Sequence, residues 1–313
     1  MTDALVLDLI SKSYGNVRAV EGLSLNVPTG SVYGFLGPNG SGKTTTIRMI
    51  VNILAPDSGS IRIQGKPGGD GIKDLIGYLP EERGLYAKMK VRELLEFFAA
   101  LKGVPAATAK PRVAEWLERL ELGSWGEKKV NEMSKGMQQK VQFIVAVIAD
   151  PPILILDEFS SGLDPVNANL LKDVLLELRG RGKTILFSTH RMEEAERICD
   201  HVCLINRGHK VLDGRLAELR AAAGKSTLRV DCGGDRALLR QAPGVLQVDD
   251  FGNYAELRLA PEAQSAAAAA QILRFLAPKL EITRFELLEP TLNQIFLDTV
   301  GAAAPPVAVG AAS

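Results

Sequence analysis

The stretch Gly37–Thr44, which reads Gly-Pro-Asn-Gly-Ser-Gly-Lys-Thr, decides the fold of this 313-residue chain. It has the spacing G-x-x-x-x-G-K-[ST] and lies between an expected strand, Ser31–Leu36, and an expected helix, Thr44–Val51. Its glycines let backbone N–H groups converge on phosphate oxygens, and the start of the helix adds partial positive charge. We expect Lys43 to reach the β- and γ-phosphates and the Thr44 hydroxyl to ligate Mg²⁺. The stretch therefore predicts a nucleoside triphosphate site.

Acidic residues follow a second expected strand, Ile153–Leu156, whose continuous apolar run indicates burial on both faces. In a doubly wound sheet, ligands bind at the carboxyl ends of the strands. Asp157 is suited to hold Mg²⁺, and Glu158 is suited to activate water as a general base. A further buried strand, Thr184–Ser188, leads to His190, whose imidazole can hydrogen-bond a γ-phosphate at the same edge.

The composition limits the possible partners. Lysine and arginine number 37 and so do aspartate and glutamate, which gives a net charge of +0, and aromatic residues make up 5%. No nucleic-acid partner is expected, because such proteins show a basic excess or a basic stripe. The cysteines, Cys199, Cys203 and Cys232, form no Cys-x-x-Cys pair and are typical of a reducing compartment. No signal peptide is expected, and the apolar runs are far shorter than the roughly 18 residues of a membrane span.

The sequence predicts two domains. Residues 1–222 alternate strands with helical periods, which favours an α/β fold with a parallel sheet and a helical insertion over residues 83–131, extended as a subdomain to about 140. Residues 226–300 predict strands and helices in the order β-α-β-β-α-β, typical of a small ferredoxin-like α+β domain. A last helix is expected over Leu292–Thr299. The uncharged, Ala/Pro/Gly-rich tail, residues 301–313, is expected to be disordered.

Over residues 5–219 these motifs resemble the ATP-binding subunit of an ABC transporter, a P-loop NTPase. The resemblance implies that Gly37–Thr44 is the Walker A loop, that Asp157 closes Walker B, that Glu158 is the catalytic glutamate, and that His190 is the switch histidine. The implied catalytic residues are Lys43, Glu158 and His190. The implied ATP-binding residues are Tyr14, stacked on adenine, and Gly37, Pro38, Asn39, Gly40, Ser41, Gly42, Lys43, Thr44 and Thr45.

The resemblance extends to parts that would act on a second protomer. Residues 133–138, Met-Ser-Lys-Gly-Met-Gln, resemble the signature motif, and Ser134 is a good N-cap for the helix that follows. A capped helix start is an anion site, and in the family it meets the ATP of the other protomer. The implied contacts are Ser134, Lys135, Gly136 and Met137, together with Ser161, Gly162 and Asp164 of the D-loop.

Three residues depart from the family pattern. Lys135 replaces the first signature glycine, and Met137 replaces the signature glutamine. Lys135 either adds positive charge near the phosphate or faces solvent. Glu81 stands where the family has the Q-loop glutamine, and it is either a third Mg²⁺ ligand beside Thr44 and Asp157 or a solvent-exposed loop residue. Because Lys43 and Glu158 are retained, activity is expected.

The C-terminal domain ends in residues 289–297, Glu-Pro-Thr-Leu-Asn-Gln-Ile-Phe-Leu, and resembles the extra domain of bacterial drug- and sodium-export ATPases. Together, the resemblances imply an ATP- and Mg²⁺-dependent subunit that powers an exporter by closing a dimer, either of identical chains or with a paralogue. It would serve a separate transmembrane permease from the cytoplasmic face of the cell membrane. The alternative is a soluble ABC ATPase that acts on ribosomes or DNA, which the single phosphate loop and the lack of sustained heptads disfavour.

Overall fold

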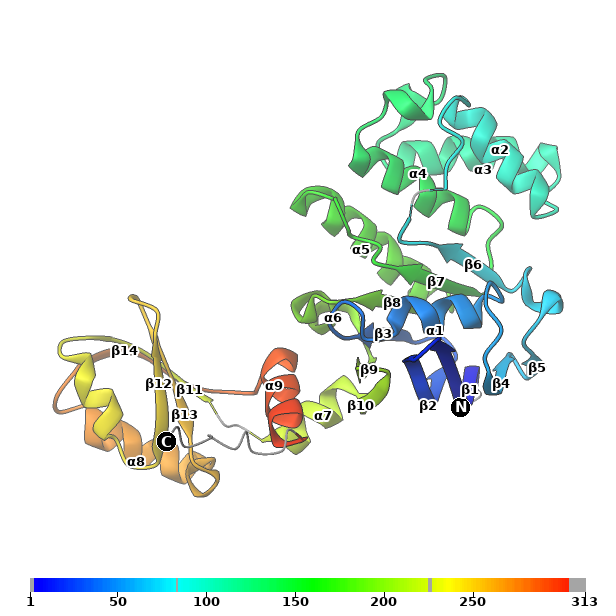
Figure 1. Cartoon of the computed structure of the whole chain (residues 1–313). Helices are drawn as coiled ribbons and strands as arrows, with labels where there is room; N and C mark the ends of the chain where they lie inside the picture. Colours follow the sequence, from blue (N-terminus) through cyan, green and yellow to red (C-terminus); the bar gives the residue numbers. More distant parts are fainter. Residues whose placement is uncertain (1–2, 83, 225–226, 304–313) are drawn as a thin grey trace, which may run out of the picture. The chain divides into compact units, whose positions relative to one another are not determined.

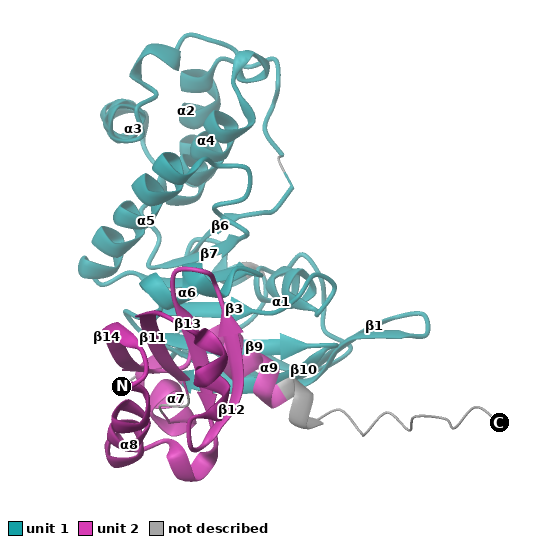
Figure 2. Ribbon diagram, turned by 90° about the vertical axis from the view of Figure 1, so that its left-hand side faces the viewer, with its two compact units in different colours: residues 1–214 teal, residues 215–313 magenta. Residues whose placement is uncertain are grey.

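The computed structural model describes residues 3–82, 84–224 and 227–303. Two compact units divide the chain, residues 1–214 and residues 215–313, drawn in separate colours in Figure 2. The division falls several residues before the boundary at 222 that we expected from the sequence, and it places helix α7 (Leu216–Ala223) in the second unit. In the described part of the chain, we find no helix that combines the length and the apolar character needed to cross a membrane.

The first unit is built on a six-stranded sheet with the order β10-β9-β3-β8-β7-β6 (Figure 1). Strands β3, β6, β7 and β8 run parallel to their neighbours, and every residue of β7 and β8 is buried. The carboxyl ends of β3, β7 and β8 therefore meet at one edge, as the α/β prediction requires. The strands are β3 (Val32–Leu36), β6 (Ile76–Leu79), β7 (Ile153–Asp157), β8 (Thr184–Thr189), β9 (His201–Asn206) and β10 (His209–Arg215).

Helices complete the first unit. The helices α1 (Lys43–Ile50), α5 (Pro165–Gly180) and α6 (Met192–Ile198) follow β3, β7 and β8 in the chain. Between β6 and β7 lies the expected helical insertion, made of α2 (Val91–Leu101), α3 (Ala106–Arg119) and α4 (Lys135–Val147) with two short 3₁₀ turns. Its buried side chains include Val91, Leu94, Val113 and Trp116, at the helical spacing seen in the sequence.

A second sheet in this unit was missed by the sequence analysis. It is antiparallel, with the order β2-β1-β4-β5, and its strands are β1 (Asp3–Tyr14), β2 (Val17–Pro28), β4 (Ser58–Ile63) and β5 (Lys66–Pro67). The buried side chains of β1 and β2 share one apolar core with Tyr33 and Phe35 of β3 and with Ile47 of α1. This core holds α1, and with it the phosphate loop, against both sheets.

The second unit has the predicted α+β arrangement. Its antiparallel sheet has the order β12-β13-β11-β14, so the first and last strands of the domain are neighbours, as in a ferredoxin-like fold. The elements are β11 (Thr227–Gly233), the 3₁₀ helix Arg236–Gln241, β12 (Val245–Asp250), β13 (Ala255–Leu259), α8 (Ala266–Leu276) and β14 (Glu281–Leu288). Leu228, Leu257 and Ile272 lie in its own apolar core.

Helix α9 (Leu292–Ala303) closes the described chain. It contacts α7, and its Leu292 and Ile295 are buried. We expected residues 301–313 to form a disordered tail, but residues 301–303 belong to α9. The rest of that tail lies outside the described residues. Part of the apolar surface of α9 is therefore covered within its own unit.

Candidate active site

Glycines shape the phosphate loop between β3 and α1. Gly37 and Gly42 have φ of 155° and 108°, a backbone region that other residues rarely adopt. A Cβ on Gly37 would lie 2.2 Å from the Ile205 carbonyl oxygen, and one on Gly42 would lie 2.4 Å from the Ala19 carbonyl oxygen. Both positions thus need glycine for conformation and for space. Gly42 is also the N-cap of α1, so the loop ends on free helix N–H groups.

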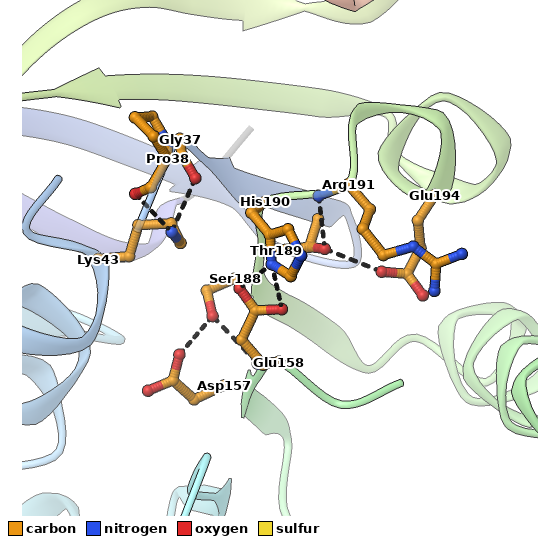
Figure 3. Close-up of polar contacts among 10 residues, drawn as sticks. All are labelled: Gly37, Pro38, Lys43, Asp157, Glu158, Ser188, Thr189, His190, Arg191 and Glu194. Carbon is orange, nitrogen blue, oxygen red and sulfur yellow. Dashed lines mark hydrogen bonds and ion pairs between the residues drawn. The ribbon is translucent and has the colours of Figure 1, made fainter. Parts of the chain in front are cut away.

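Lys43 is buried inside this loop. Its Nζ donates hydrogen bonds to the carbonyl oxygens of Gly37 at 2.8 Å and Pro38 at 3.1 Å (Figure 3). Burial lowers the pKa of Lys43, whereas the nearby carboxylates of Glu158 and Asp157 oppose that change. The ammonium group is held by neutral carbonyl oxygens and has few contacts with solvent. Phosphate oxygens can replace these partners favourably, because hydrogen bonds between charged groups are stronger than those to neutral oxygens.

Asp157 ends β7 beside Ser188 of β8, and the two residues are paired in the parallel register. The Ser188 hydroxyl donates a hydrogen bond to Asp157 Oδ1, while the buried Oδ2 has no hydrogen-bond partner. Burial raises the pKa of Asp157, and hydrogen bonding from Ser188 and Thr44 opposes that rise. A buried, unpartnered carboxylate oxygen near a threonine hydroxyl suits a hard cation such as Mg²⁺. In the described ranges, no three His, Cys, Asp or Glu side chains gather as a metal cluster.

Glu158 faces His190 across the same edge. The His190 Nδ1 lies 3.0 Å and 3.1 Å from the two Glu158 carboxylate oxygens (Figure 3). The Glu158 side chain is 8% exposed and the His190 side chain 49%, so the histidine lies between the carboxylate and solvent. Burial raises the pKa of Glu158, and the contact with His190 opposes that rise. A half-desolvated carboxylate of raised pKa is a stronger base than one in water.

One cavity brings the phosphate loop together with two of the predicted acidic residues. It is lined by Ala19, Asn39, Gly40, Gly42, Lys43, Thr44, Thr45, Glu81 and Glu158. Glu81 is exposed, but its loop is held in place because Gln142 Nε2 donates to the carbonyl oxygens of Pro80 and Glu82 at 3.2 Å and 3.1 Å. Tyr14 is not among the lining residues: it ends β1 with 48% of its surface exposed.

The signature and the D-loop lie next to each other within the chain. Ser134 caps α4 by accepting a hydrogen bond from the Met137 N–H at 3.3 Å, and Lys135 is exposed. A Cβ on Gly136 would lie 3.4 Å from the Leu163 side chain and 3.6 Å from the Gly162 carbonyl oxygen. In the D-loop, Ser161 and Gly162 are exposed. Asp164 caps α5 by accepting from the Val166 and Asn167 N–H groups, both at 3.0 Å.

Sequence reasoning missed two residues of the site. Ala19 lies in β2, just after the turn that joins β1 to β2, and its carbonyl oxygen approaches Gly42. The sequence identifies Ser188 only as the end of a buried strand. In a strand that is buried on both faces, the pattern of residues does not distinguish a functional hydroxyl from a structural one. The place of Ser188 in the site becomes apparent only from its pairing with Asp157 in the parallel register.

Comparison with known proteins identifies the family. Residues 20–161 match the ABC transporter family model, and residues 214–300 match the model of the "ATP-binding protein DrrA1-3-like, C-terminal domain". The chain is 44% identical over 298 residues to the uncharacterized ABC transporter ATP-binding protein YhaQ of Bacillus subtilis, covering 95% of this chain and 99% of the relative. The chain is an ABC transporter ATP-binding protein. Its predicted identity and fold class are thereby confirmed.

Other relatives of this ABC ATP-binding protein extend the picture. The Nod factor export ATP-binding protein I of Paraburkholderia xenovorans is 41% identical over 222 residues, which cover 70% of this chain and 73% of the relative. A solved ATP-binding subunit of an ABC transporter superposes with a TM-score of 0.66 at 31% identity over 70% of this chain and 92% of its own. A dimeric cassette in a post-hydrolysis state with ADP and Pi superposes with a TM-score of 0.64 at 25% identity over 68% and 98%.

These findings settle the class of activity. The protein is an ATPase subunit of an ABC transporter, and it binds adenine nucleotide. The predicted enzyme class is confirmed, and the alternative role on ribosomes or DNA finds no support among the relatives. Related cassettes form dimers, and one is part of a transporter complex.

Proposed function

We propose that this ABC ATP-binding protein powers export through a separate transmembrane permease, from the cytoplasmic face of the cell membrane, as a dimer that closes on ATP. Export is supported by the name of the Paraburkholderia relative, a Nod factor export ATP-binding protein. The observation that carries the catalytic part is the contact of the buried Glu158 carboxylate with the half-exposed His190, beside the cavity of the phosphate loop.

In this proposal, the chain's own residues divide the work on ATP. Lys43 exchanges its two carbonyl partners for phosphate oxygens, aided by the N–H groups at the start of α1. Thr44 and Asp157 Oδ2 hold Mg²⁺, with Glu81 as a further candidate ligand. Mg²⁺ supplies neutralisation of the charge on the β- and γ-phosphates. Glu158 takes a proton from the attacking water, and His190 orients the Glu158 carboxylate and donates toward the γ-phosphate.

The second half of the site comes from another protomer. The residues proposed to meet the partner's ATP are Ser134, Lys135, Gly136 and Met137 of the signature and Ser161, Gly162 and Asp164 of the D-loop. Ser134 and Ser161 are exposed, and Ser134 stands at the start of α4, where the helix dipole favours an anion. The partner is either an identical chain or a paralogue. In both cases binding favours the closed dimer, and hydrolysis removes the γ-phosphate that holds it.

An apolar groove supports docking on a permease. It lies between the α1–β4 connection, β6 and α2, and its lining includes Val51, Ile53, Tyr78, Phe98 and Leu101. Ile53 and Leu101 both line this groove and are 58% and 69% exposed, and an exposed apolar groove of this kind indicates an interaction site. We infer that a short amphipathic helix of the permease covers this groove.

The test begins with the neighbouring reading frames, where the proposal predicts a multi-span membrane protein, and continues with reconstitution of this chain together with that protein. We expect the two to co-purify from detergent, and vesicles that contain both to expel substrate only with ATP. The Leu101→Glu variant should lose the membrane partner while it keeps the ATPase activity of the isolated subunit. Co-sedimentation with ribosomes instead of membranes, or co-purification that Leu101→Glu leaves unchanged, would contradict the proposal.

A further inference from the structure

Ser188 occupies a junction that the proposed chemistry leaves without a role. It lies on β8, two residues before His190, and it is fully buried. Its hydroxyl donates a hydrogen bond to Asp157 Oδ1 and accepts one from the Glu158 N–H at 3.1 Å (Figure 3). The Ser188 hydroxyl therefore contacts both acidic residues: it is the donor to the Asp157 carboxylate and the acceptor from the Glu158 backbone.

The bond to Asp157 determines which carboxylate oxygen is free. Because Oδ1 is taken by the Ser188 hydroxyl, the carboxylate cannot rotate without breaking a buried, charge-assisted hydrogen bond. The other oxygen, Oδ2, is then left buried and without a hydrogen-bond partner. Hydrogen bonds from residues beyond the ligands commonly orient metal-binding side chains in this way.

The bond to Glu158 supports an unusual backbone. Glu158 has φ of 51°, in the left-handed region that non-glycine residues seldom adopt. Its N–H is shared between the Ser188 hydroxyl and the Ser188 carbonyl oxygen, at 3.1 Å and 3.2 Å. This turn directs the Glu158 side chain out of the strand toward His190. Backbone strain of this kind persists only where the surroundings hold it in place.

We propose that Ser188 is a positioning residue that orients Asp157 toward Mg²⁺ and Glu158 toward the attacking water, an inference that rests on the function proposed above. The role requires the hydroxyl group and not merely a small side chain. Two variants of equal shape should therefore differ in behaviour. Thr keeps a hydroxyl group at this position, whereas Val has the same size and branching without one.

The experiment compares wild type with Ser188→Ala, Ser188→Thr and Ser188→Val in the full chain. A fluorescent ATP analogue is titrated with and without Mg²⁺, and kcat and KM for ATP are measured separately. Thr184→Val is the matched control, because Thr184 is a buried hydroxyl on the same strand whose partner is the distant Gly30 N–H at 2.9 Å. Melting temperatures establish that every variant is folded.

We expect nucleotide binding without Mg²⁺ to be equal in all variants. Ser188→Ala and Ser188→Val should need about tenfold more Mg²⁺ for half-maximal effect on binding, and their kcat should fall while KM at saturating Mg²⁺ stays unchanged. Ser188→Thr should retain most of the wild-type behaviour, and Thr184→Val all of it.

The inference is overturned if Ser188→Ala keeps the wild-type Mg²⁺ requirement, or if the Thr and Val variants behave alike. The binding titration does not depend on turnover, so it decides the role of Ser188 on its own. A wild-type protein that hydrolyses no ATP would instead overturn the proposed function.

Discussion

Lys43 and Glu158 illustrate how single residues can separate nucleotide binding from hydrolysis. Lys43→Ala removes a buried cation whose partners are the loop carbonyls, and we expect about 10- to 100-fold weaker ATP binding. Glu158→Gln preserves the shape of the side chain but removes the base, so ATP should still bind while kcat falls by about 10²- to 10⁴-fold. Equilibrium binding and phosphate-release assays on both variants measure the two effects. Wild-type turnover in Glu158→Gln would disprove the assignment of the base.

Glu81 tests whether the loop after β6 contributes to the metal. Its carboxylate lines the cavity of the phosphate loop, and a carboxylate there attracts Mg²⁺ more strongly than an amide does. We therefore expect Glu81→Gln to raise the Mg²⁺ concentration at half-maximal ATPase rate by up to about tenfold, with little change in ATP affinity at saturating Mg²⁺. A Mg²⁺ titration of the steady-state rate measures this. If the two titrations superpose, Glu81 is only a loop residue.

At the scale of elements, helix α4 should serve both stability and assembly. Ser134→Ala removes the hydroxyl that accepts from the Met137 N–H, at a cost of about 1 kcal/mol in the stability of the first unit. The same hydroxyl is exposed for a second protomer, so we expect ATP-dependent dimerisation to weaken while ATP binding to the single chain is unchanged. Denaturant unfolding and sedimentation velocity check the two parts. A variant that dimerises normally would limit Ser134 to its capping role.

The elements predicted best are those whose signals are local. The phosphate loop, the buried strands β7 and β8 and the helices of the insertion follow from glycine spacing, apolar runs and helical periodicity. Strand β1 was missed because its alternation is interrupted. Register shifts occur between Leu7 and Ile10, and Leu9 bulges outward with φ of 48° and 61% exposure. A bulge moves every later side chain to the other face, so the period of two is lost.

The site shows the same limit. Residues carried by a motif, such as Lys43 and Asp157, could be predicted, because the motif itself encodes their chemistry. Ser188 could not, since its role depends on its register opposite Asp157 across two strands far apart in the chain. Ala19 could not either, because it contributes a backbone carbonyl, which is not encoded by residue type.

At the scale of the whole molecule, the two units should be separable. The second unit has its own core, and one related cassette matches 98% of its own length with 68% of this chain. We expect a chain that ends at Gly214 to bind ATP as the full chain does but to dimerise more weakly or hydrolyse ATP at an altered basal rate. Nucleotide titration and sedimentation of both chains provide the comparison. A truncated chain that is folded but cannot bind ATP would refute the separation into two modules.

The central claim is that ATP closes a dimer and hydrolysis reopens it. It is tested most directly by the molar mass of Glu158→Gln in solution, measured by size exclusion with light scattering in Mg²⁺ and ATP, in Mg²⁺ and ADP, and without nucleotide. Because this variant binds ATP but should hydrolyse it very slowly, we predict a dimer with ATP and a monomer in the other two conditions. The same molar mass in all three conditions would contradict the claim.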